Sequence, residues 1–438
     1  MQRITRRIGS MLAVLACAAC AGPPVEDLMP TPVLYSELDL SPLDRIPEQQ
    51  RWKPRRVYYA TTRQREPTPM RIDYNNEESE LIAAGLSLIG FGGPQLSWSD
   101  LSDYSRVSER PDTVDLSIAG LLEAGSFKPS LEGPVSEDDA EGLSWLIADM
   151  NKSIDSARDK DLLIYVHGAK VNFYNANVFA AMLDHFMGRD MTSIAFSWPT
   201  RQNILAYGMG DDRERAYRSA PALASLLEVL AKRTHARRIN IVCWSAGGRV
   251  TTAALKELYE RNAGGDQDLR ERLRIGTVYF AAADVPTTEF LDALPSINQL
   301  ANRVVVTLSS KDEALNMGQT FMGGGARIGQ RDQNLDEGQI AAIREADRLE
   351  VIDVSRGWEG RGFDITGHRY WMDHPWASSD LVLAIRTDFS PEERGLESAG
   401  DGGVLWALPA DYPERLRKEL TREGIRLRID DALNDGEE

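Results

Sequence analysis

Segments typical of buried strands alternate with segments typical of helices from about residue 143 onward, and this alternation constrains the fold more than any other feature. The strand-like runs lie at 161–168, 192–199, 238–244, 274–283, 303–310 and 349–355. Between two of them, Leu223, Leu227 and Leu230 recur at helical spacing. In a sheet of parallel strands that are joined through helices, the helices pack on both faces of the sheet. The sequence therefore predicts an α/β fold, a mainly parallel sheet covered by helices on both faces.

The length of 438 residues suits one large α/β domain with additions, which we place at residues 55–390. It opens on a strand at 55–63. The pattern of residues 64–140 is less regular, and we expect an irregular insertion or hairpins at the edge of the sheet. Within it, the run at 81–93 is uncharged and rich in glycine. This run favours a buried hairpin at an antiparallel edge of the sheet over a lid or a membrane-facing patch. Residues 391–438 are predicted to be a linker, a solvated helix and an acidic tail.

The N-terminus is typical of a secretion signal, which we place at residues 1–20. Three arginines precede an uncharged run from Ile8 to Ala19. Small residues flank Cys17 and Cys20, as around the lipidated cysteine of bacterial lipoproteins; a cleaved signal without lipid is the alternative. Residues 21–54 begin with a proline-rich stretch and are predicted to be a tether. We expect a lipid anchor that holds the protein at the cell envelope, at the periplasmic face of the outer membrane.

Charge and histidine spacing exclude several kinds of partner. The formal net charge of −17 argues against nucleic acid, because phosphate binding needs a clustered positive surface. The five histidines show no spacing typical of metal ligands. We therefore expect no nucleic-acid partner, no metal site and no cofactor.

The stretch "VCWSAGGRV" at 242–250 places a serine between a strand and a helix. It is close to the Gly-x-Ser-x-Gly turn that exposes a nucleophilic serine, with Gly247 kept and Cys243 in place of the first glycine. Ser245 is therefore a candidate nucleophile; the alternative is an ordinary serine in a turn. The strand at 161–168 ends in His167 and Gly168, which predicts an oxyanion site made by the backbone amides of Ala169 and Ala246. His167 itself is expected to hold the loop.

A base and an acid should follow the serine in the chain order Ser, Asp, His. Asp312 follows the strand at 303–310, and Asp284, after the preceding strand, is its rival. His368 lies in a loop after the last strand, and His374 is the rival base. We predict that Asp312 and His368 complete the triad.

Six stretches carry a resemblance to a known family: "VYYATTR", "YVHGAKVNFYNA", "FSWPTRQNILAYGMGDDRERAYRSAPALASLL", "CWSAGGRV", "SSKDEALNMG" and "TGHRYW". Over roughly residues 55–385 the chain resembles the esterase/lipase-like α/β-hydrolases of unknown function. The resemblance implies the α/β-hydrolase fold, with Ser245, Asp312 and His368 as the catalytic residues. Where that family usually has His-Ser-Met-Gly, this chain has Trp-Ser-Ala-Gly, and Trp244 is expected to narrow the pocket.

These observations together predict a serine hydrolase of the carboxylic-ester class. It would act through an acyl-enzyme on a small-molecule or lipid ester and would contact the membrane through its N-terminal lipid. The competing interpretation is a non-catalytic protein that keeps the hydrolase fold as an interaction module of the envelope.

Overall fold

The computed structural model describes most of the chain. The described residues are 26–67, 72–129, 133–202, 210–264, 268–312, 315, 325–331, 335–357, 367–400 and 403–421. The predicted signal with Cys17 and Cys20 lies outside them, as does the predicted acidic tail beyond residue 421. No helix of the described part is long and apolar enough to cross a membrane.

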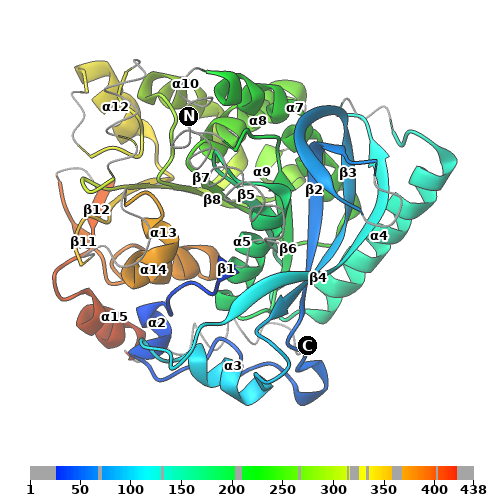
Figure 1. Ribbon diagram of the computed structural model, residues 1–438. Coiled ribbons are helices and arrows are strands. Elements are labelled where there is room, and N and C mark those ends of the chain that lie inside the picture. Colours follow the sequence, from blue (N-terminus) through cyan, green and yellow to red (C-terminus); the bar gives the residue numbers. More distant parts are fainter. Residues whose placement is uncertain are drawn as a thin grey trace, which may run out of the picture.

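A twelve-stranded sheet forms the centre of the molecule (Figure 1). Its strands are β1 (Glu26–Asp27), β2 (Arg55–Arg65), β3 (Tyr74–Phe91), β4 (Asp115–Phe127), β5 (Leu162–Val166), β6 (Thr192–Ser197), β7 (Ile239–Trp244), β8 (Ile275–Ala281), β9 (Ala301–Leu308), β10 (Leu349–Asp353), β11 (Glu397–Ser398) and β12 (Leu405–Ala407). Their order is β1-β4-β3-β2-β6-β5-β7-β8-β9-β10-β12-β11. From β2 to β12 neighbouring strands are parallel, and the pairings beyond them at both ends are antiparallel.

Helices cover both faces of this sheet. They are α2 (Val33–Ser36), α3 (Trp98–Tyr104), α4 (Glu137–Ser156), α5 (Phe173–Phe186), α7 (Asp211–Arg233), α8 (Gly247–Asn262), α9 (Leu269–Leu273), α10 (Thr287–Leu300), α12 (Glu337–Glu345), α13 (Tyr370–Asp373), α14 (Pro375–Arg386) and α15 (Tyr412–Thr421), with a 3-10 turn at Glu48–Gln50. In Figure 1, α7, α8 and α10 lie on one side, and α5, α13 and α14 lie on the other.

Alternating side chains of the central strands supply the two cores. In β7, Val242 and Trp244 join the core under α5, α13 and α14, whereas Ile241 and Cys243 join the core under α7, α8 and α10. Because both faces are covered, every residue of this strand is buried. The predicted α/β fold, with a mainly parallel sheet between two helical layers, is confirmed.

The region 64–140 contains the antiparallel edge of the sheet. Strand β3 pairs with β2 on one side and with β4 on the other. The run at 81–93, which favoured a buried hairpin at an antiparallel edge, lies mostly within β3: it is one strand of the antiparallel part of the sheet and not a whole hairpin. At Gly85, an added Cβ would lie 2.0 Å from the Leu122 carbonyl oxygen, so the close approach of β4 requires a glycine there.

The prediction of a tether at 21–54 is wrong for residues 26–54. The strand Glu26–Asp27 pairs with β4, and Leu28, Met29 and Leu43 are at most 3% exposed. These apolar side chains fill the core next to α5 and α14. Their burial stabilises the domain and fixes the segment, which therefore forms part of the folded body.

The prediction of a linker from residue 391 is also wrong. Strand β12 extends the sheet by pairing in parallel with β10. Arg394 is fully buried and forms ion pairs with Glu350 and Asp380. Helix α15, expected to be solvated, buries Tyr412 and Leu416 against the core.

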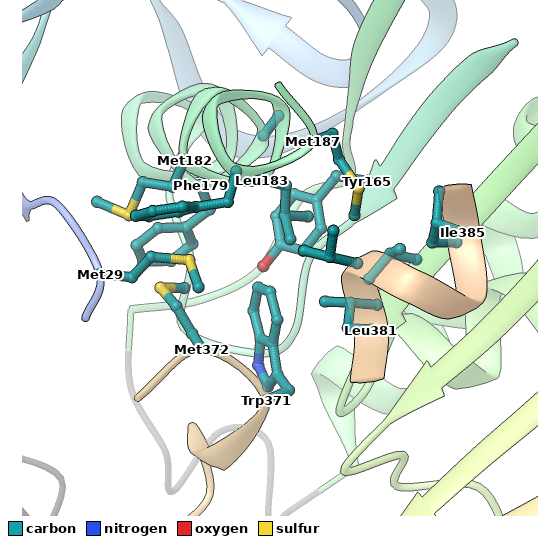
Figure 2. Packing of buried hydrophobic residues seen from close by; sticks show 14 of the residues in the cluster. Met29, Tyr165, Phe179, Met182, Leu183, Met187, Trp371, Met372, Leu381 and Ile385 are labelled. Atoms are coloured by element: carbon teal, nitrogen blue, oxygen red, sulfur yellow. The ribbon is translucent and has the colours of Figure 1, made fainter. Parts of the chain in front are cut away.

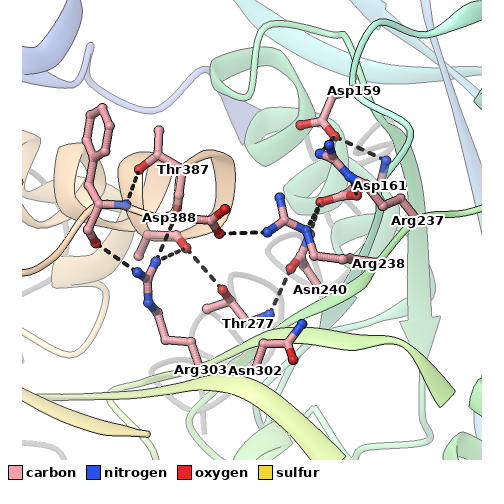
Figure 3. Close-up of polar contacts among 12 residues, drawn as sticks. Asp159, Asp161, Arg237, Arg238, Asn240, Thr277, Asn302, Arg303, Thr387 and Asp388 are labelled. Atoms are coloured by element: carbon pink, nitrogen blue, oxygen red, sulfur yellow. Dashed lines mark hydrogen bonds and ion pairs between the residues drawn. The ribbon is translucent and has the colours of Figure 1, made fainter. Parts of the chain in front are cut away.

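Ion pairs tie together the edge of the sheet at which the parallel strands begin (Figure 3). Asp161 accepts hydrogen bonds from Arg237 at 3.0 Å and Arg238 at 2.8 Å, and Arg238 also pairs with Asp388 at 2.8 Å. These ion pairs join the segments at the amino ends of the parallel strands. The carboxyl ends of the strands, where α/β proteins place their ligand sites, lie at the opposite edge.

Candidate active site

Ser245 occupies a strained turn between β7 and α8. Its φ is +53°, a conformation that non-glycine residues adopt rarely and at a cost of order 1–3 kcal/mol. The turn is tight because α8 begins directly against β5: a Cβ on Gly247 would lie 2.4 Å from the carbonyl oxygen of Val166 and 2.6 Å from that of His167. Strand, sharp turn and helix give the geometry that projects a serine from the edge of a sheet.

Cys243, which stands where the first glycine of the motif would be, is a packing residue. Its side chain is fully buried in the core beneath α7 and α8, and its sulfur lies 3.5 Å from the Tyr279 carbonyl oxygen. Burial raises the pKa of the Cys243 thiol. Since the thiolate is the nucleophilic form, a buried thiol of this kind is unreactive. The turn accepts the Cys243 side chain because it points into the core beneath α7 and α8.

The structure brings Ser245, His368 and Asp312 together. The Nε2 atom of His368 lies 2.7 Å from the Ser245 Oγ, and its Nδ1 atom lies 2.8 Å from Asp312 Oδ2. A carboxylate can only accept, so Nδ1 carries the proton and Nε2 is left to accept from the serine hydroxyl. The Asp312 side chain is fully buried, whereas that of His368 is 15% exposed. The arrangement is that of a nucleophile, a base and an acid that orients the base.

The segment that follows His368 is anchored in the core. Tyr370 accepts a hydrogen bond from the Ala282 amide at 3.0 Å and donates to the Thr307 carbonyl at 3.0 Å. Trp371 and Met372 point into an apolar cluster with Tyr165, Phe179 and Met29 (Figure 2). These contacts hold helix α13, and so hold the imidazole over the serine.

Trp244 also contacts the histidine. Its indole N–H donates to the His368 carbonyl oxygen at 3.1 Å, and the two ring centroids are 5.6 Å apart. Trp244 is 8% exposed. These contacts tie the loop of His368 to the turn of Ser245, and the narrowing of the pocket by Trp244 stays a prediction.

A loop after β5 passes directly against the serine. A Cβ on Gly168 would lie 3.0 Å from the Ser245 Cβ. Ala169 follows Gly168 in this loop, and Ala246 follows Ser245 at the start of α8. Both predicted oxyanion donors therefore belong to segments that adjoin the serine.

His167 holds this loop. It is fully buried, its Nδ1 donates to the Gly168 carbonyl at 2.7 Å, and its Nε2 accepts from the Trp198 amide at 3.1 Å. The Trp198 indole donates in turn to the His167 carbonyl at 2.7 Å, and the two rings stack. Burial and the nearby Arg63 charge hold the pKa of His167 well below its usual range. The ring stays neutral in the loop-holding place that we expected.

Arg63, at the end of β2, joins three motifs and was not singled out from the sequence. It is 1% exposed, its Nε donates to Ser197 Oγ at 2.9 Å, and its Nη2 donates to the Val171 carbonyl at 2.6 Å. Burial lowers the pKa of Arg63 to about 9. Arg63 and Trp198 together hold the loop at residues 167–171. Arg63 lies in the stretch "VYYATTR" and Trp198 in "FSWPT", and these motifs were the sequence signal that could have identified them.

The rival acid Asp284 has other partners. It is 7% exposed and forms ion pairs with Arg327 at 2.7 Å and Arg249 at 3.3 Å. Burial raises the pKa of Asp284 to about 6, against the attraction of Arg327. Asp284 adjoins the site, because its backbone amide donates to the Ser245 carbonyl at 3.1 Å. Its carboxylate does not take the place of Asp312 on His368.

The contacts of His374, the rival base, are structural. It is fully buried, its Nε2 donates to the Arg356 carbonyl at 2.8 Å, and its Nδ1 caps helix α14 by accepting from the Trp376 amide. Burial lowers the pKa of His374 to about 4. Its imidazole is therefore neutral in the folded protein over the physiological range.

Acid should destabilise the protein through His374. Its pKa is about 4 when folded and 6.5 when unfolded, so the unfolded chain binds more protons between these values and stability falls as pH drops. By pH 5 the loss amounts to about 2 kcal/mol relative to pH 7.5. Asparagine also caps helices but does not titrate. The advantage of wild type over His374→Asn in free energy of unfolding should therefore shrink by that amount in urea titrations. An advantage independent of pH would show that His374 is not buried neutral.

Within the described ranges, no three His, Cys, Asp or Glu residues gather closely enough to hold a metal ion.

Comparison with known proteins assigns the family. The model of a family described as alpha/beta hydrolase of unknown function (DUF900) matches residues 145–384, which is more than half of the chain. The protein belongs to this family. A search of curated proteins finds no match. The matched part of this α/β hydrolase runs from α4 to α14 and contains Ser245, Asp312 and His368. The resemblance inferred from the sequence, as regards the family and its fold, is confirmed.

Proposed function

We propose that this α/β hydrolase is a serine hydrolase that cleaves carboxylic esters. One observation carries the proposal: a single imidazole, that of His368, lies 2.7 Å from the Ser245 hydroxyl and 2.8 Å from a buried carboxylate. A serine hydroxyl is a weak nucleophile unless a neighbouring base can take its proton. The strained turn places Ser245 at the carboxyl edge of the sheet, and the adjoining amides of Ala169 and Ala246 are the candidate oxyanion donors.

The reaction would proceed in two halves. The Ser245 Oγ forms a bond to the acyl carbon while its proton moves to Nε2 of His368, and the amides of Ala169 and Ala246 stabilise the oxyanion. The imidazolium then gives that proton to the departing alcohol, and an acyl-enzyme remains. Water attacks this ester by the same route, releases the acid and restores the serine. Asp312 orients the imidazole and stabilises the imidazolium.

A substrate panel tests the reaction class. Full-length protein in detergent is assayed with matched ester, thioester and anilide substrates of one short acyl chain. We expect turnover of the ester above the other two, and its loss in Ser245→Ala. Turnover that persists in the alanine variant would refute the assignment of the serine. No turnover in the wild type would instead favour the non-catalytic interaction protein.

We also propose that a lipid on Cys17 or Cys20 anchors the protein at the cell envelope, most simply at the periplasmic face of the outer membrane. The arginines and the uncharged run before these cysteines support the proposal. Replacing both cysteines by alanine should release the protein from the membrane fraction or block its processing. Each single variant should show which cysteine carries the lipid. An unchanged membrane fraction in the double variant would contradict the anchor.

A further inference from the structure

A cavity of about 300 Å³ lies between helices α4 and α7, over the neighbouring strands β3, β2 and β6. Its floor includes Ala60 of β2 and Ala84 of β3, which are paired in the sheet and belong to the core on this face. Two small side chains at adjacent positions leave space that larger ones would fill. The volume lies at the lower end of the range typical of small-molecule pockets.

The walls of this cavity are apolar. Leu146 and Met150 of α4 line it on one side, and Val229 and Leu230 of α7 line it on the other. The Tyr58 hydroxyl, also in the lining, donates to Asp149 at 2.8 Å, so this polar group already has its partner. Walls of this kind favour an apolar ligand, because a polar one would lose its hydrogen bonds to water without replacement.

Two basic side chains lie at the mouth of the cavity. Lys232 and Arg233, in the last turn of α7, line it and are exposed. Neither forms an ion pair with another residue in the described part of the chain. The helix end has a cation of its own, because Arg274 donates to the carbonyl oxygens of Ala231 and, at 3.2 Å, of Thr234. Lys232 and Arg233 can therefore pair with an anion at the mouth.

The acidic residues of α4 near this mouth have partners. Asn151 donates to the Arg233 carbonyl at 3.1 Å, which places the C-terminal half of α4 beside the end of α7. In that half, Asp149 forms an ion pair with an arginine of β2, and Asp155 lies 3.0 Å from the Nδ1 atom of His235. These carboxylates are thus held by other side chains.

The cavity lies away from the proposed active site. Helix α7 ends at Arg233 and β7 begins at Ile239, so the mouth adjoins the edge of the sheet where the parallel strands begin. Ser245 lies at the opposite edge, after the end of β7. The described lining shares no residue with the triad. A ligand bound here would occupy a second site, and the inference does not depend on the proposed hydrolase activity.

We propose that this cavity binds a free fatty acid, with its chain over Ala60 and Ala84 and its carboxylate on Lys232 and Arg233. A fatty acid combines the two features that the site requires, an apolar chain for the walls and an anion for the mouth. The volume of about 300 Å³ favours one chain over the two chains of a membrane lipid.

A photoreactive fatty acid tests the site in the full-length protein. The protein in a maltoside detergent is irradiated with a diazirine analogue of dodecanoic acid or with the corresponding alcohol, and the adducts are mapped by peptide mass spectrometry. The alcohol carries the same chain without the charge and cannot be hydrolysed. We expect the acid to label α4 and α7 about 10-fold more than the alcohol does, and unlabelled dodecanoate to compete.

Exposed and partly exposed positions supply the variants. The double variant Lys232→Gln with Arg233→Gln should reduce labelling by the acid to the level of the alcohol. Lys418→Gln, which changes an exposed lysine in the last turn of another helix, α15, should leave it unchanged. Val229→Trp should fill the cavity and reduce labelling by both probes.

Three results would overturn the proposal. They are equal labelling of the wild type by acid and alcohol, an excess of acid labelling that survives the double glutamine variant, and adducts confined to segments other than α4 and α7. Labelling that appears only after Cys17 and Cys20 are both replaced by alanine would assign the cavity to the protein's own lipid instead. Because the readout is an adduct and not hydrolysis, none of these results bears on the hydrolase proposal.

Discussion

His368→Ala should lower kcat for an ester substrate by about a millionfold, because loss of the base from a serine triad costs as much as loss of the whole triad. Without the imidazole, nothing accepts the Ser245 proton as the Oγ–C bond forms. The effect should fall on kcat and leave KM nearly unchanged, since His368 touches the hydroxyl and not the remote parts of a substrate. Steady-state kinetics with a 4-nitrophenyl ester measure both constants.

His374→Asn is the matched control for this histidine. His374 lies six positions further along the chain, but its ring bonds the Arg356 carbonyl and caps α14. Asparagine preserves the cap, so activity at neutral pH should stay within a few-fold of wild type. If the two variants lost activity equally, His368 would have no special role and the base would have to be sought elsewhere.

Asp312→Asn should lower kcat by about 10⁴-fold with little change in fold. The carboxylate accepts the Nδ1 proton of His368 at 2.8 Å and so fixes the tautomer that leaves Nε2 free for the serine. An amide at this position can donate to Nδ1 instead, which moves the proton to Nε2, where it blocks the reaction. It also removes the negative charge that stabilises the imidazolium.

Asp284→Asn separates catalysis from stability. It removes the carboxylate that Arg249 and Arg327 share, and breaking a buried pair typically costs about 3–5 kcal/mol of stability. Hydrolysis of a neutral ester by the folded variant should fall far less than in Asp312→Asn. Urea unfolding and kinetics on the same preparations give both quantities. If Asp284→Asn lost more kcat than Asp312→Asn, the two carboxylates would have to exchange roles.

The parallel core and the catalytic candidates were accessible from the sequence. Parallel strands are buried on both faces, so strands such as β5 (LLIYV) and β8 (IGTVYFA) are largely apolar and easy to recognise. The chain order of Ser245, Asp312 and His368 follows from the topology that places strand ends at one edge. Choosing Asp312 over Asp284 needed only their loop contexts, and the structure places Asp312 on the histidine.

The segments near the two ends of the chain that pack onto the core could not be predicted from the sequence. Leu28, Met29 and Leu43 are spaced without helical or strand period, so nothing local distinguishes their segment from a tether. The same holds for the stretch around Arg394, whose burial depends on partners in β10 and α14. A charged residue in a polar stretch indicates exposure unless its tertiary partners are known.

The residues that support the site escaped prediction for a similar reason. Arg63 reaches the loop at 167–171 across more than a hundred positions, at the Val171 carbonyl. Arg249 and Arg327 meet at Asp284 only because α8, β8 and the segment at 325–331 converge on one edge of the sheet. Such contacts depend on strand order, which sequence pattern alone leaves open.

Covalent labelling by a fluorophosphonate tests the central claim most directly, because the probe reacts with a serine only where a base has activated it. The intact mass of the full-length protein should rise by one probe equivalent, and peptide mapping should place the adduct on Ser245. Ser245→Ala should remain folded and unlabelled, and His368→Ala should label far more slowly. Labelling of Ser245→Ala at the wild-type rate, or a wild-type protein that stays unlabelled under conditions that label a known serine hydrolase, would contradict the account.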